Sequence, residues 1–325
     1  ILETFDFAEA YTSAPESVVV PSGRLNTLDA LEIVPSGRAV GAEIQGVDLA
    51  KPVPTELADA LRQAWADHLV LLFRDQKIDP DNYIDAANIF GKVQVAANKA
   101  YYEKANRKSL YHVMEQDITI LCNLGDDGKP VESNDSLGSL EVIWHSDNSY
   151  IEQPPAGSTL YSIVIPTDNS GQTSFNNQYL AYDELPADLL AAIEGKQSKH
   201  DATRNSANVL RPGVTEPTCP EEVPGPFHPM VRVHPVTGKK ALYLGRRRTW
   251  PSQYIEGIPN DSEEILDRLW AHATQPKYSW THEWQVGDFL VWDNRSAMHR
   301  REVVNSTMPR VMWRSQFAGE KVISG

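Results

Sequence analysis

Short apolar runs separated by turn residues fill the second half of the chain. From residue 156 onward, the segments STLYSIVI, MVRVH, KALYLG, FLVWDN and RVMWRSQFAG are divided by stretches rich in turn-forming residues. This spacing is typical of the strands of a β-sandwich or jelly roll. Similar β-like runs, punctuated by Gly and Pro, fill residues 28–49. The pattern therefore predicts a mainly β fold.

Helical periodicity interrupts the β pattern at two places in the first part of the chain. In segment 54–68 apolar residues recur at helical spacing, and the strand-like run LVLLFR follows directly. Segment 79–91 has Asp79 at the N-cap position, Pro80 in the first turn and Gly91 as a stop. We expect two helices here, the first of which leads into a buried strand.

Two further helices are expected in the second half. One lies near 183–194, and one begins at Asp261, where Asp261 and Glu264 have the spacing of a capping box. No repeat, low-complexity tract or linker divides the sequence. Helices that flank a mainly β core indicate a single domain of the α+β class, covering residues 1–325.

Two segments lack a clear periodicity. Residues 1–27 mix Pro, Ser, Thr and Glu and are interpreted as an irregular N-terminal arm. Residues 94–141 are polar and irregular over a length that is usually functional or disordered. We interpret this second segment as an active-site lid, with Tyr101 and Tyr102 as candidate aromatic walls of a substrate pocket.

The composition narrows the classes of partner. The 325 residues are 41% apolar, enough for a well-buried core, and no apolar run approaches the roughly 20 residues of a membrane span. Forty-four acidic and 30 basic residues give a net charge of −14, which repels nucleic acid and anionic membranes. We therefore expect small-molecule partners, and any site for an anion must be built from locally placed arginines.

Cysteine usage favours a reducing, cytoplasmic setting. Only Cys122 and Cys219 occur, far apart and without CxxC spacing, so neither a disulfide framework nor a thiolate zinc site is indicated. No signal-peptide pattern opens the sequence, and its first residue, Ile1, leaves a processed leader open.

A histidine and an aspartate stand two positions apart in the run VIWHSDNSY. Residues i and i+2 of a strand face the same side, so His145 and Asp147 could bind one ion. Taken alone, such a pair is more typical of a capped strand end. However, His299 follows the end of the apolar strand FLVWDN within five residues. Two histidines and one carboxylate form the facial triad that suits Fe(II) and leaves coordination positions open for catalysis.

The remaining histidines are weaker candidates. His228 and His234 would lie about 20 Å apart on an extended strand, too far to share an ion. We interpret both as strand-end or turn residues. The others have no partner pattern that indicates a metal site: His68, His112, His200, His272 and His282.

Two arginines four positions apart follow His299. Arg310 and Arg314 bracket Val, Met and Trp in RVMWR, and residues i and i+4 of a strand face the same way. Both guanidinium groups are therefore expected in the cavity that holds the metal, where they can bind carboxylates. Trp313 should point to the opposite face and pack in the core. Without His299 upstream, two solvent-facing arginines would be the simpler interpretation.

These residues resemble the taurine dioxygenase and 2,4-dichlorophenoxyacetate dioxygenase family of Fe(II)- and 2-oxoglutarate-dependent oxygenases. The similarity runs from about residue 29 to residue 321 and includes, in order, GAEIQGVDL, HLVLLFRDQKIDP, WHSDNSYIEQPPAGSTL, HPVTGKKALY, VGDFLVWDNRSAMHR and PRVMWR. It implies a double-stranded β-helix (jelly roll) core with flanking helices. It also implies Fe(II) as cofactor and 2-oxoglutarate and O2 as cosubstrates.

Carried over by position, the resemblance assigns the site residues. It implies that His145, Asp147 and His299 are the iron ligands, that Arg310 binds the distal carboxylate of 2-oxoglutarate, and that Thr173 hydrogen-bonds the same cosubstrate. The reaction would hydroxylate a C–H bond and release succinate and CO2. Because the carboxylate ligand that halogenating relatives lack is present, hydroxylation is favoured.

The substrate is expected to be a small acidic compound. Arg314 matches the position at which family members with anionic substrates bind the acidic group. The sequence departs from the family where Met312 and Trp313 precede Arg314, and where NDSLGSLEVI brings Glu141 near a substrate-facing position. These departures argue against taurine itself. Glu141 is also a candidate resting partner of Arg314.

Other functional hypotheses for the same residues stay open. A cupin-like zinc or manganese hydrolase would use the same three ligands with a metal-bound water, but Arg310 and Thr173 would then have no role. A non-catalytic jelly-roll binding module would make the triad coincidental. A homo-oligomeric assembly is also open.

Overall fold

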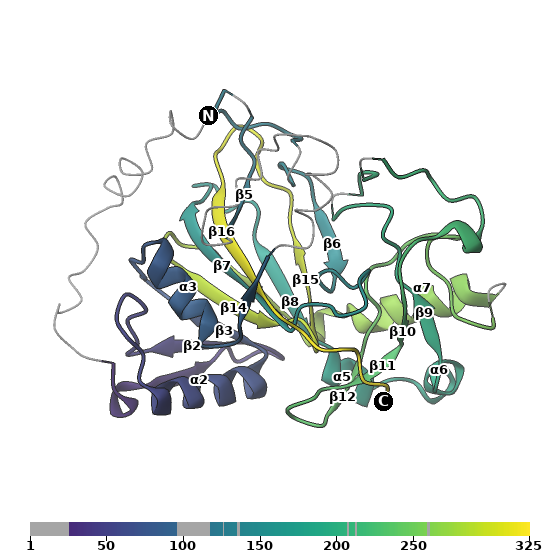
Figure 1. The fold of residues 1–325 in the computed structure, drawn as a ribbon, viewed down its shortest axis with the longest axis horizontal. Coiled ribbons are helices and arrows are strands. Elements are labelled where there is room, and N and C mark those ends of the chain that lie inside the picture. The colour runs from purple at the N-terminus through teal and green to yellow at the C-terminus, as the bar shows by residue number, and fades with distance from the viewer. Residues whose placement is uncertain are drawn as a thin grey trace.

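The centre of the computed structural model consists of two β-sheets that pack together (Figure 1). The model describes residues 26–95, 118–125, 127–134, 137–206, 208–211, 213–258 and 261–325. The larger sheet has the strand order β1-β2-β3-β14-β7-β16-β4, with β5 also paired to β16, and the smaller has the order β13-β8-β15-β6. All these pairs are antiparallel except β2 with β3. The predicted mainly β, α+β jelly-roll architecture is confirmed.

The strands of both sheets are short. The larger sheet contains β1 (Glu32–Pro35), β2 (Ala42–Gln45), β3 (Val70–Phe73), β14 (Phe289–Asp293), β7 (Gly157–Val164), β16 (Val311–Phe317), β4 (Val93–Gln94) and β5 (Thr119–Cys122). The smaller contains β13 (Ser279–His282), β8 (Thr173–Asn177), β15 (Ala297–Arg301) and β6 (Val142–His145). Two accessory hairpin-like pairs are β9 (Gln197–Lys199) with β10 (Phe227–Pro229) and β11 (Val231–Val233) with β12 (Lys240–Leu242).

Helices flank the sheets at two ends of the molecule. Helices α2 (Thr55–His68) and α3 (Pro80–Asn88) lie against the larger sheet, and α5 (Gln178–Asp183), α6 (Ala187–Ile193) and α7 (Ser262–Ala273) gather near β9–β12 (Figure 1). Short 3₁₀ helices are η1 (Leu28–Ala30), η2 (Pro220–Glu222) and η4 (Pro276–Tyr278). None of the described helices is long and apolar enough to cross a membrane.

The helix predictions hold with two differences. The Asp79 side chain accepts from the Asn82 N–H at 2.8 Å, so it caps α3 as predicted. The helix expected near 183–194 is α6, which begins after Pro186, and an additional short helix, α5, precedes it. The capping box predicted from Asp261 is wrong, because this side chain makes no capping hydrogen bond. Instead, the Ser262 hydroxyl donates to the carbonyl of Ile258 at 2.8 Å.

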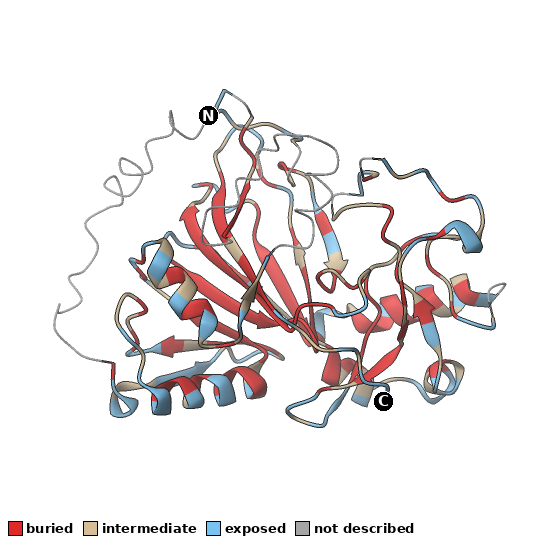
Figure 2. Ribbon diagram, viewed as in Figure 1, coloured by how far each residue is buried: buried red, intermediate tan, exposed pale blue. Residues whose placement is uncertain are grey.

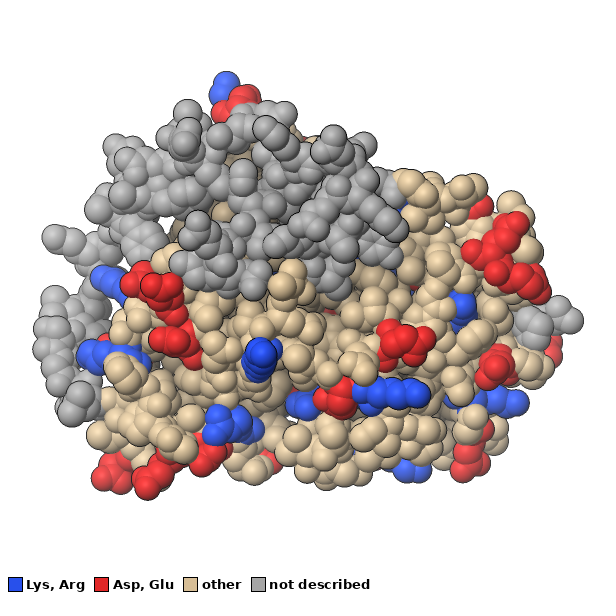
Figure 3. Space-filling view, viewed as in Figure 1, with Lys and Arg blue, Asp and Glu red and all other residues tan. Residues whose placement is uncertain are grey.

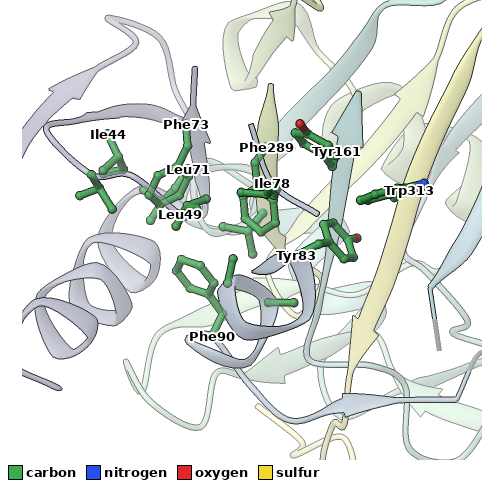
Figure 4. Close-up of a cluster of buried hydrophobic side chains, with 14 of the residues drawn as sticks. Ile44, Leu49, Leu71, Phe73, Ile78, Tyr83, Phe90, Tyr161, Phe289 and Trp313 are labelled. Atoms are coloured by element: carbon green, nitrogen blue, oxygen red, sulfur yellow. The ribbon is translucent and has the colours of Figure 1, made fainter. Parts of the chain in front are cut away.

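An apolar core lies between the larger sheet and helices α2 and α3 (Figure 4). Leu57, Leu61 and Trp65 bury the predicted face of α2, while its opposite face is exposed (Figure 2). Trp313 packs in this core at a ring-centroid distance of 5.7 Å from Tyr83, as expected for the face opposite Arg314. Strand alternation on β16 therefore separates the core from the cavity between the sheets.

Two predicted segment boundaries need correction. Residues 119–122, inside the predicted lid 94–141, form β5 of the larger sheet, with Ile120 buried against the core. Tyr101 and Tyr102 lie outside the described residues. The predicted arm 1–27 does not extend to Asn26, whose buried side chain donates to the carbonyl of Asp48 at 2.9 Å. Residues 1–25 lie outside the described part.

Candidate active site

The three predicted metal ligands meet between the two sheets. His145 ends β6 and is directly opposite His299 on β15 in the strand register, with ring centroids 4.1 Å apart. Asp147 follows β6, and its Oδ1 lies 3.6 Å from His145 Nε2 and 3.8 Å from His299 Nε2. One ligand atom from each residue lies within 4.8 Å of the others, and all three residues are buried. Distant segments therefore converge as the spacing predicted.

The protonation states of these residues suit a divalent cation. Burial, and next the charge of Arg246, lower the pKa of His145 to about 4, and burial likewise holds the pKa of His299 well below its usual range. Burial opposes ionisation of Asp147, yet the charge of Arg314 and the adjacent histidines hold its pKa well below the usual value. At neutral pH the site presents two neutral imidazoles and one carboxylate.

The ring orientation of His145 also fits metal binding. Its Nδ1 lies 2.8 Å from the carbonyl oxygen of Ile143, which fixes the proton on Nδ1 and leaves the Nε2 lone pair facing Asp147 and His299. Two imidazole nitrogens and one carboxylate oxygen on one side of an ion are the donor set of the Fe(II) facial triad. Among the described residues, this is the one group of His, Cys, Asp and Glu side chains placed to hold a metal.

Residues that the sequence reasoning missed hold Asp147 in place. Asn294 Oδ1 accepts from the Asp147 N–H at 2.6 Å, and Asn294 Nδ2 donates to the Asp147 carbonyl at 3.0 Å. The Ser158 hydroxyl donates to Asp147 Oδ2 at 2.8 Å. Asn294 belongs to the quoted run FLVWDN, but no periodicity could have joined it to a residue 147 positions away. The carboxylate is thus oriented from β7 and from the end of β14.

Arg314 lies beside the metal ligands. Its Nη2 is 2.6 Å from Asp147 Oδ2, an ion pair whose angle falls outside hydrogen-bond geometry, and its Nε and Nη2 have no hydrogen-bond partner among the described residues. The predicted position in the cavity is correct. The resting partner suggested for Arg314 is wrong, because that partner is Asp147 and not Glu141, which is exposed just before β6.

Arg310 and Thr173 are both buried, Arg310 just before β16 and Thr173 at the start of β8. Arg310 is 3% exposed, and burial together with the charge of Arg301 holds its pKa well below the usual value. Among the described residues no carboxylate lies within 4.0 Å of its guanidinium group. Gly171, with φ +76, lies beside Arg310, and a Cβ there would come within 2.7 Å of Val304 Cγ2. The Thr173 hydroxyl accepts from Trp284 Nε1 at 3.0 Å.

The surroundings of Arg310 and Thr173 suit a carboxylate ligand. A buried cation without a carboxylate partner is costly, so an anion that neutralises Arg310 is expected there. Because the Trp284 indole already donates to the Thr173 oxygen, the Thr173 proton remains available to a carboxylate. Trp284 is a second residue that the sequence reasoning did not identify.

The histidines judged weaker candidates have other partners. His234 Nε2 lies 2.9 Å from Asp293 Oδ2, and His282 Nε2 lies 2.9 Å from Asp288 Oδ2. His228 Nε2 lies 3.0 Å from the carbonyl of Ile151. They are structural residues of the strands and turns around the site.

Comparison with known proteins identifies a family model and relatives that match most of this chain. The family model described as "Taurine catabolism dioxygenase TauD, TfdA family" matches residues 32–316. The (S)-phenoxypropionate/alpha-ketoglutarate-dioxygenase of Sphingobium herbicidovorans is 29% identical over 306 residues, covering 90% of this chain and 96% of the relative. The alpha-ketoglutarate-dependent 2,4-dichlorophenoxyacetate dioxygenase of Burkholderia sp. (strain RASC) is 30% identical over 272 residues, which cover 82% of this chain and 87% of the relative.

A solved structure has the same fold. The crystal structure of AAD-2 in complex with Mn(II) and N-oxalylglycine is 29% identical, with a TM-score of 0.72 over 91% of this chain and 99% of the other. The alternatives of a cupin-like hydrolase and of a non-catalytic binding module are therefore set aside. The chain belongs to the TauD/TfdA family of Fe(II)- and 2-oxoglutarate-dependent non-heme dioxygenases.

Proposed function

We propose that this dioxygenase hydroxylates a C–H bond of a small acidic organic substrate whose anionic group binds Arg314. The observation that carries the proposal is the position of this guanidinium group, 2.6 Å from the metal ligand Asp147 with donors still available. Relatives are named for acidic compounds or their esters, namely phenoxypropionate, 2,4-dichlorophenoxyacetate and sulfate esters. A carboxylate, sulfonate, sulfate or phosphonate is the corresponding group here.

His145, Asp147 and His299 would hold the iron and leave the remaining coordination positions to cosubstrate and dioxygen. The bound iron supplies the redox chemistry, in which 2-oxoglutarate is oxidised to succinate and CO2 and an oxygen atom enters the substrate C–H bond. The protein contributes binding, orientation and the exclusion of water. If the hydroxylated carbon also carries a heteroatom, the product would break down to a carbonyl compound.

Arg310 and Thr173 are proposed to orient 2-oxoglutarate. A guanidinium group can bind a carboxylate through two parallel hydrogen bonds, which would fix the direction of the cosubstrate. The burial of Arg310 supports this role, because water cannot compete for its donors. The Trp284 N–H holds the Thr173 oxygen so that its proton points to the same carboxylate.

Arg314 would act on the substrate and on the metal ligand at once. One side of the guanidinium group faces Asp147 Oδ2, while its side chain, 20% exposed, remains reachable from the cavity. A substrate anion bound there lies next to the iron, which brings the neighbouring C–H bond into reach. A neutral substrate would leave these donors without a partner at a cost.

The test is a panel of phenoxyalkanoates, alkyl sulfonates and alkyl sulfates, each paired with a neutral analogue such as its amide or alcohol. We expect coupled succinate release with the acids alone. Arg314→Gln should raise KM by roughly a hundredfold, the scale of a lost charge-assisted pair of about 3 kcal/mol. Substrate-independent decay of 2-oxoglutarate should persist, because Arg310 is intact.

Arg300→Gln is the matched control. Arg300 lies on β15 of the smaller sheet and pairs with Glu302 at 3.8 Å at the surface, so KM should be unchanged. Because Arg314 also contacts a metal ligand, Mn(II) affinity is measured in each variant to separate the two effects. A neutral or cationic best substrate, or an unchanged KM in Arg314→Gln, would show the anion assignment to be wrong.

A further inference from the structure

Three arginines form a cluster against residues 145–150, the segment that contains the metal ligands His145 and Asp147. Arg246 is paired with His145 in an isolated antiparallel bridge, and Arg248 follows two residues later. The Arg211 guanidinium group lies 4.4 Å from the ring centroid of Tyr150, which ends the same segment. We name Arg211, Arg246 and Arg248 the arginine cluster. It lies against residues 145–150, next to the metal centre.

The backbone is held tightly against this segment. Gly245 has φ +70, and a Cβ at this position would lie 2.3 Å from Nδ1 of His200 and 2.9 Å from the Ser149 hydroxyl oxygen. Its carbonyl accepts from the Ser146 N–H at 2.9 Å. Only glycine permits this approach. The position of Arg246 beside the metal ligand is therefore set by a close backbone contact.

Two members of the cluster lack an acidic partner. Arg246 Nη1 donates to the carbonyl of Ser206. Arg248 donates to the side-chain oxygen of Asn208 and, at 3.0 Å, to the carbonyl of Asn205. Among the described residues no carboxylate oxygen lies within 4.0 Å of either guanidinium group. Within the described parts of the chain, the direct hydrogen bonds of both guanidinium groups are therefore to neutral oxygens.

The positive charges in the cluster oppose one another. Burial, and next the charge of Arg248, lower the pKa of Arg246 to about 9. Burial lowers the pKa of Arg248 to about 10; the charge of Asp201 opposes this shift, whereas Arg204 and Arg211 act in the same direction as burial. Buried charge without a counter-charge is destabilising, and an anion placed among these groups would relieve it.

The arginine cluster is not part of a generally basic surface. On the face drawn in Figure 3, basic and acidic side chains are interspersed over the described residues, without a large basic patch. The whole chain carries a net charge of −14, so the protein as a whole repels anions. Any attraction of an anion to the cluster must therefore come from the three guanidinium groups that are gathered locally.

We propose that the arginine cluster is a second anion site of the substrate pocket, and that the substrates are small organic compounds with two acidic groups. This inference rests on the proposed function, in which Arg314 binds one acidic group beside Asp147. Arg246, opposite His145, then binds the other. The two cations flank the metal triad on different ligands, so a dianion would lie across it with the oxidised C–H bond between its acidic groups.

A structural role makes a different prediction. If Arg246 served only to hold Ser206 through its carbonyl, its removal would lower stability and leave anion binding unchanged. If Arg246 instead belongs to an anion site, its removal should weaken anion binding and should not lower stability. Arg246→Gln should leave the unfolding midpoint in sulfate-free buffer unchanged or raise it, because repulsion within the cluster is relieved.

The first experiment uses inorganic sulfate as the probe. The protein is loaded with Mn(II) and saturating 2-oxoglutarate, so that Arg310 is occupied and no turnover occurs, and its unfolding midpoint is followed against sulfate at constant ionic strength. Wild type should show a saturable rise above the linear effect of sulfate as an excluded salt. In Arg246→Gln this component should weaken at least about tenfold, the scale of one lost charge-assisted hydrogen bond.

Arg247→Gln is the matched control. Arg247 is the neighbour of Arg246 and Arg248 in sequence, but it pairs with Glu263 at 2.8 Å and with Asp267 at 2.7 Å on α7. Its replacement should keep the saturable sulfate component. Because inorganic sulfate can also bind Arg314, the comparison is repeated in the Arg314→Gln background. The saturable component that depends on Arg246 should remain there, which separates this site from the one in the proposed function. Arg246→Lys, which keeps the charge, should bind sulfate with intermediate strength.

The second experiment tests the substrate class. Phenoxyacetate, with one carboxylate, is compared with its 3- and 4-carboxyphenyl analogues in the coupled succinate assay. Wild type should have a KM at least about tenfold lower for one of the dicarboxylates, and Arg246→Gln should lose that preference while it still accepts phenoxyacetate. Equal KM values in wild type, a preference that survives in Arg246→Gln, or unchanged sulfate binding in that variant would each overturn the inference.

Discussion

Asn294 holds the metal-binding segment through a single buried amide. It bonds both the N–H and the carbonyl of Asp147, and its Nδ2 also donates to the carbonyl of Pro155 at 2.9 Å. Rotation of the Asp147 backbone would break these bonds together. Asn294 therefore acts on the metal through the ligand, as partners behind metal ligands commonly do.

Replacement of Asn294 should weaken metal binding before it affects anything else at the site. We expect Asn294→Ala to lower Mn(II) affinity by roughly ten- to a hundredfold, because the Asp147 carboxylate loses its fixed direction. Titration calorimetry with Mn(II) measures this directly. Asn305→Ala is the control, since that amide bonds Asp168 at the surface. Equal Mn(II) affinity in wild type and Asn294→Ala would contradict a positioning role.

At the scale of elements, the N-terminal ends of two helices show that a capping residue in the sequence does not always form a capping hydrogen bond. Asp79 and Asp261 both precede a helix and both look like N-caps in the sequence. Only Asp79 accepts a hydrogen bond from its helix. At α7 the Ser262 hydroxyl accepts from the Ile255 N–H at 2.8 Å and donates to the Ile258 carbonyl, so the preceding turn provides the start.

The two aspartates should therefore differ in their contribution to stability. Asp79→Ala should lower the free energy of unfolding by about 1 kcal/mol, the usual loss for an N-cap. Asp261→Ala should change it by less than about 0.5 kcal/mol, as is typical of a surface position. Urea denaturation followed by circular dichroism measures both. A loss in Asp261→Ala as large as that in Asp79→Ala would argue for a working cap at α7.

At the scale of the whole molecule, the metal centre ties the two sheets together. His145 and His299 come from the smaller sheet, whereas Asp147 is bonded to Ser158 on β7 and paired with Arg314 on β16 of the larger sheet. An ion bound to all three ligands therefore links both sheets in the folded state. No equivalent site exists in the unfolded chain.

Metal binding should consequently stabilise the entire fold. Free Mn(II) at a hundred times its dissociation constant should add about 2.7 kcal/mol to the free energy of unfolding, seen as a rise of several degrees in the thermal midpoint. Chelation should reverse it. His145→Ala, which removes one ligand, should show little of this rise. A wild-type midpoint that does not respond to Mn(II) would mean that the triad does not bind the ion in the native state.

The sequence by itself determined those features that repeat over a few residues. Strand alternation placed Trp313 in the core and Arg314 in the cavity, and helical spacing identified the buried face of α2. The same rule predicted that His145 and Asp147 face one ion, and they do lie together, although Asp147 is in the turn that follows β6. Joining them to His299 needed only the assumption that two strand ends meet, which the resemblance to a known family supported.

Only the tertiary structure decided which distant groups touch. The bonds from Asn294 to Asp147, the bridge from Arg246 to His145 and the pairing of β5 with β16 join residues about 100 to 190 positions apart. Periodicity records which way a side chain faces, but it carries no information on the partner it meets. For that reason the resting partner of Arg314 and the strand within the predicted lid were both missed, and the arginine cluster was visible only after folding.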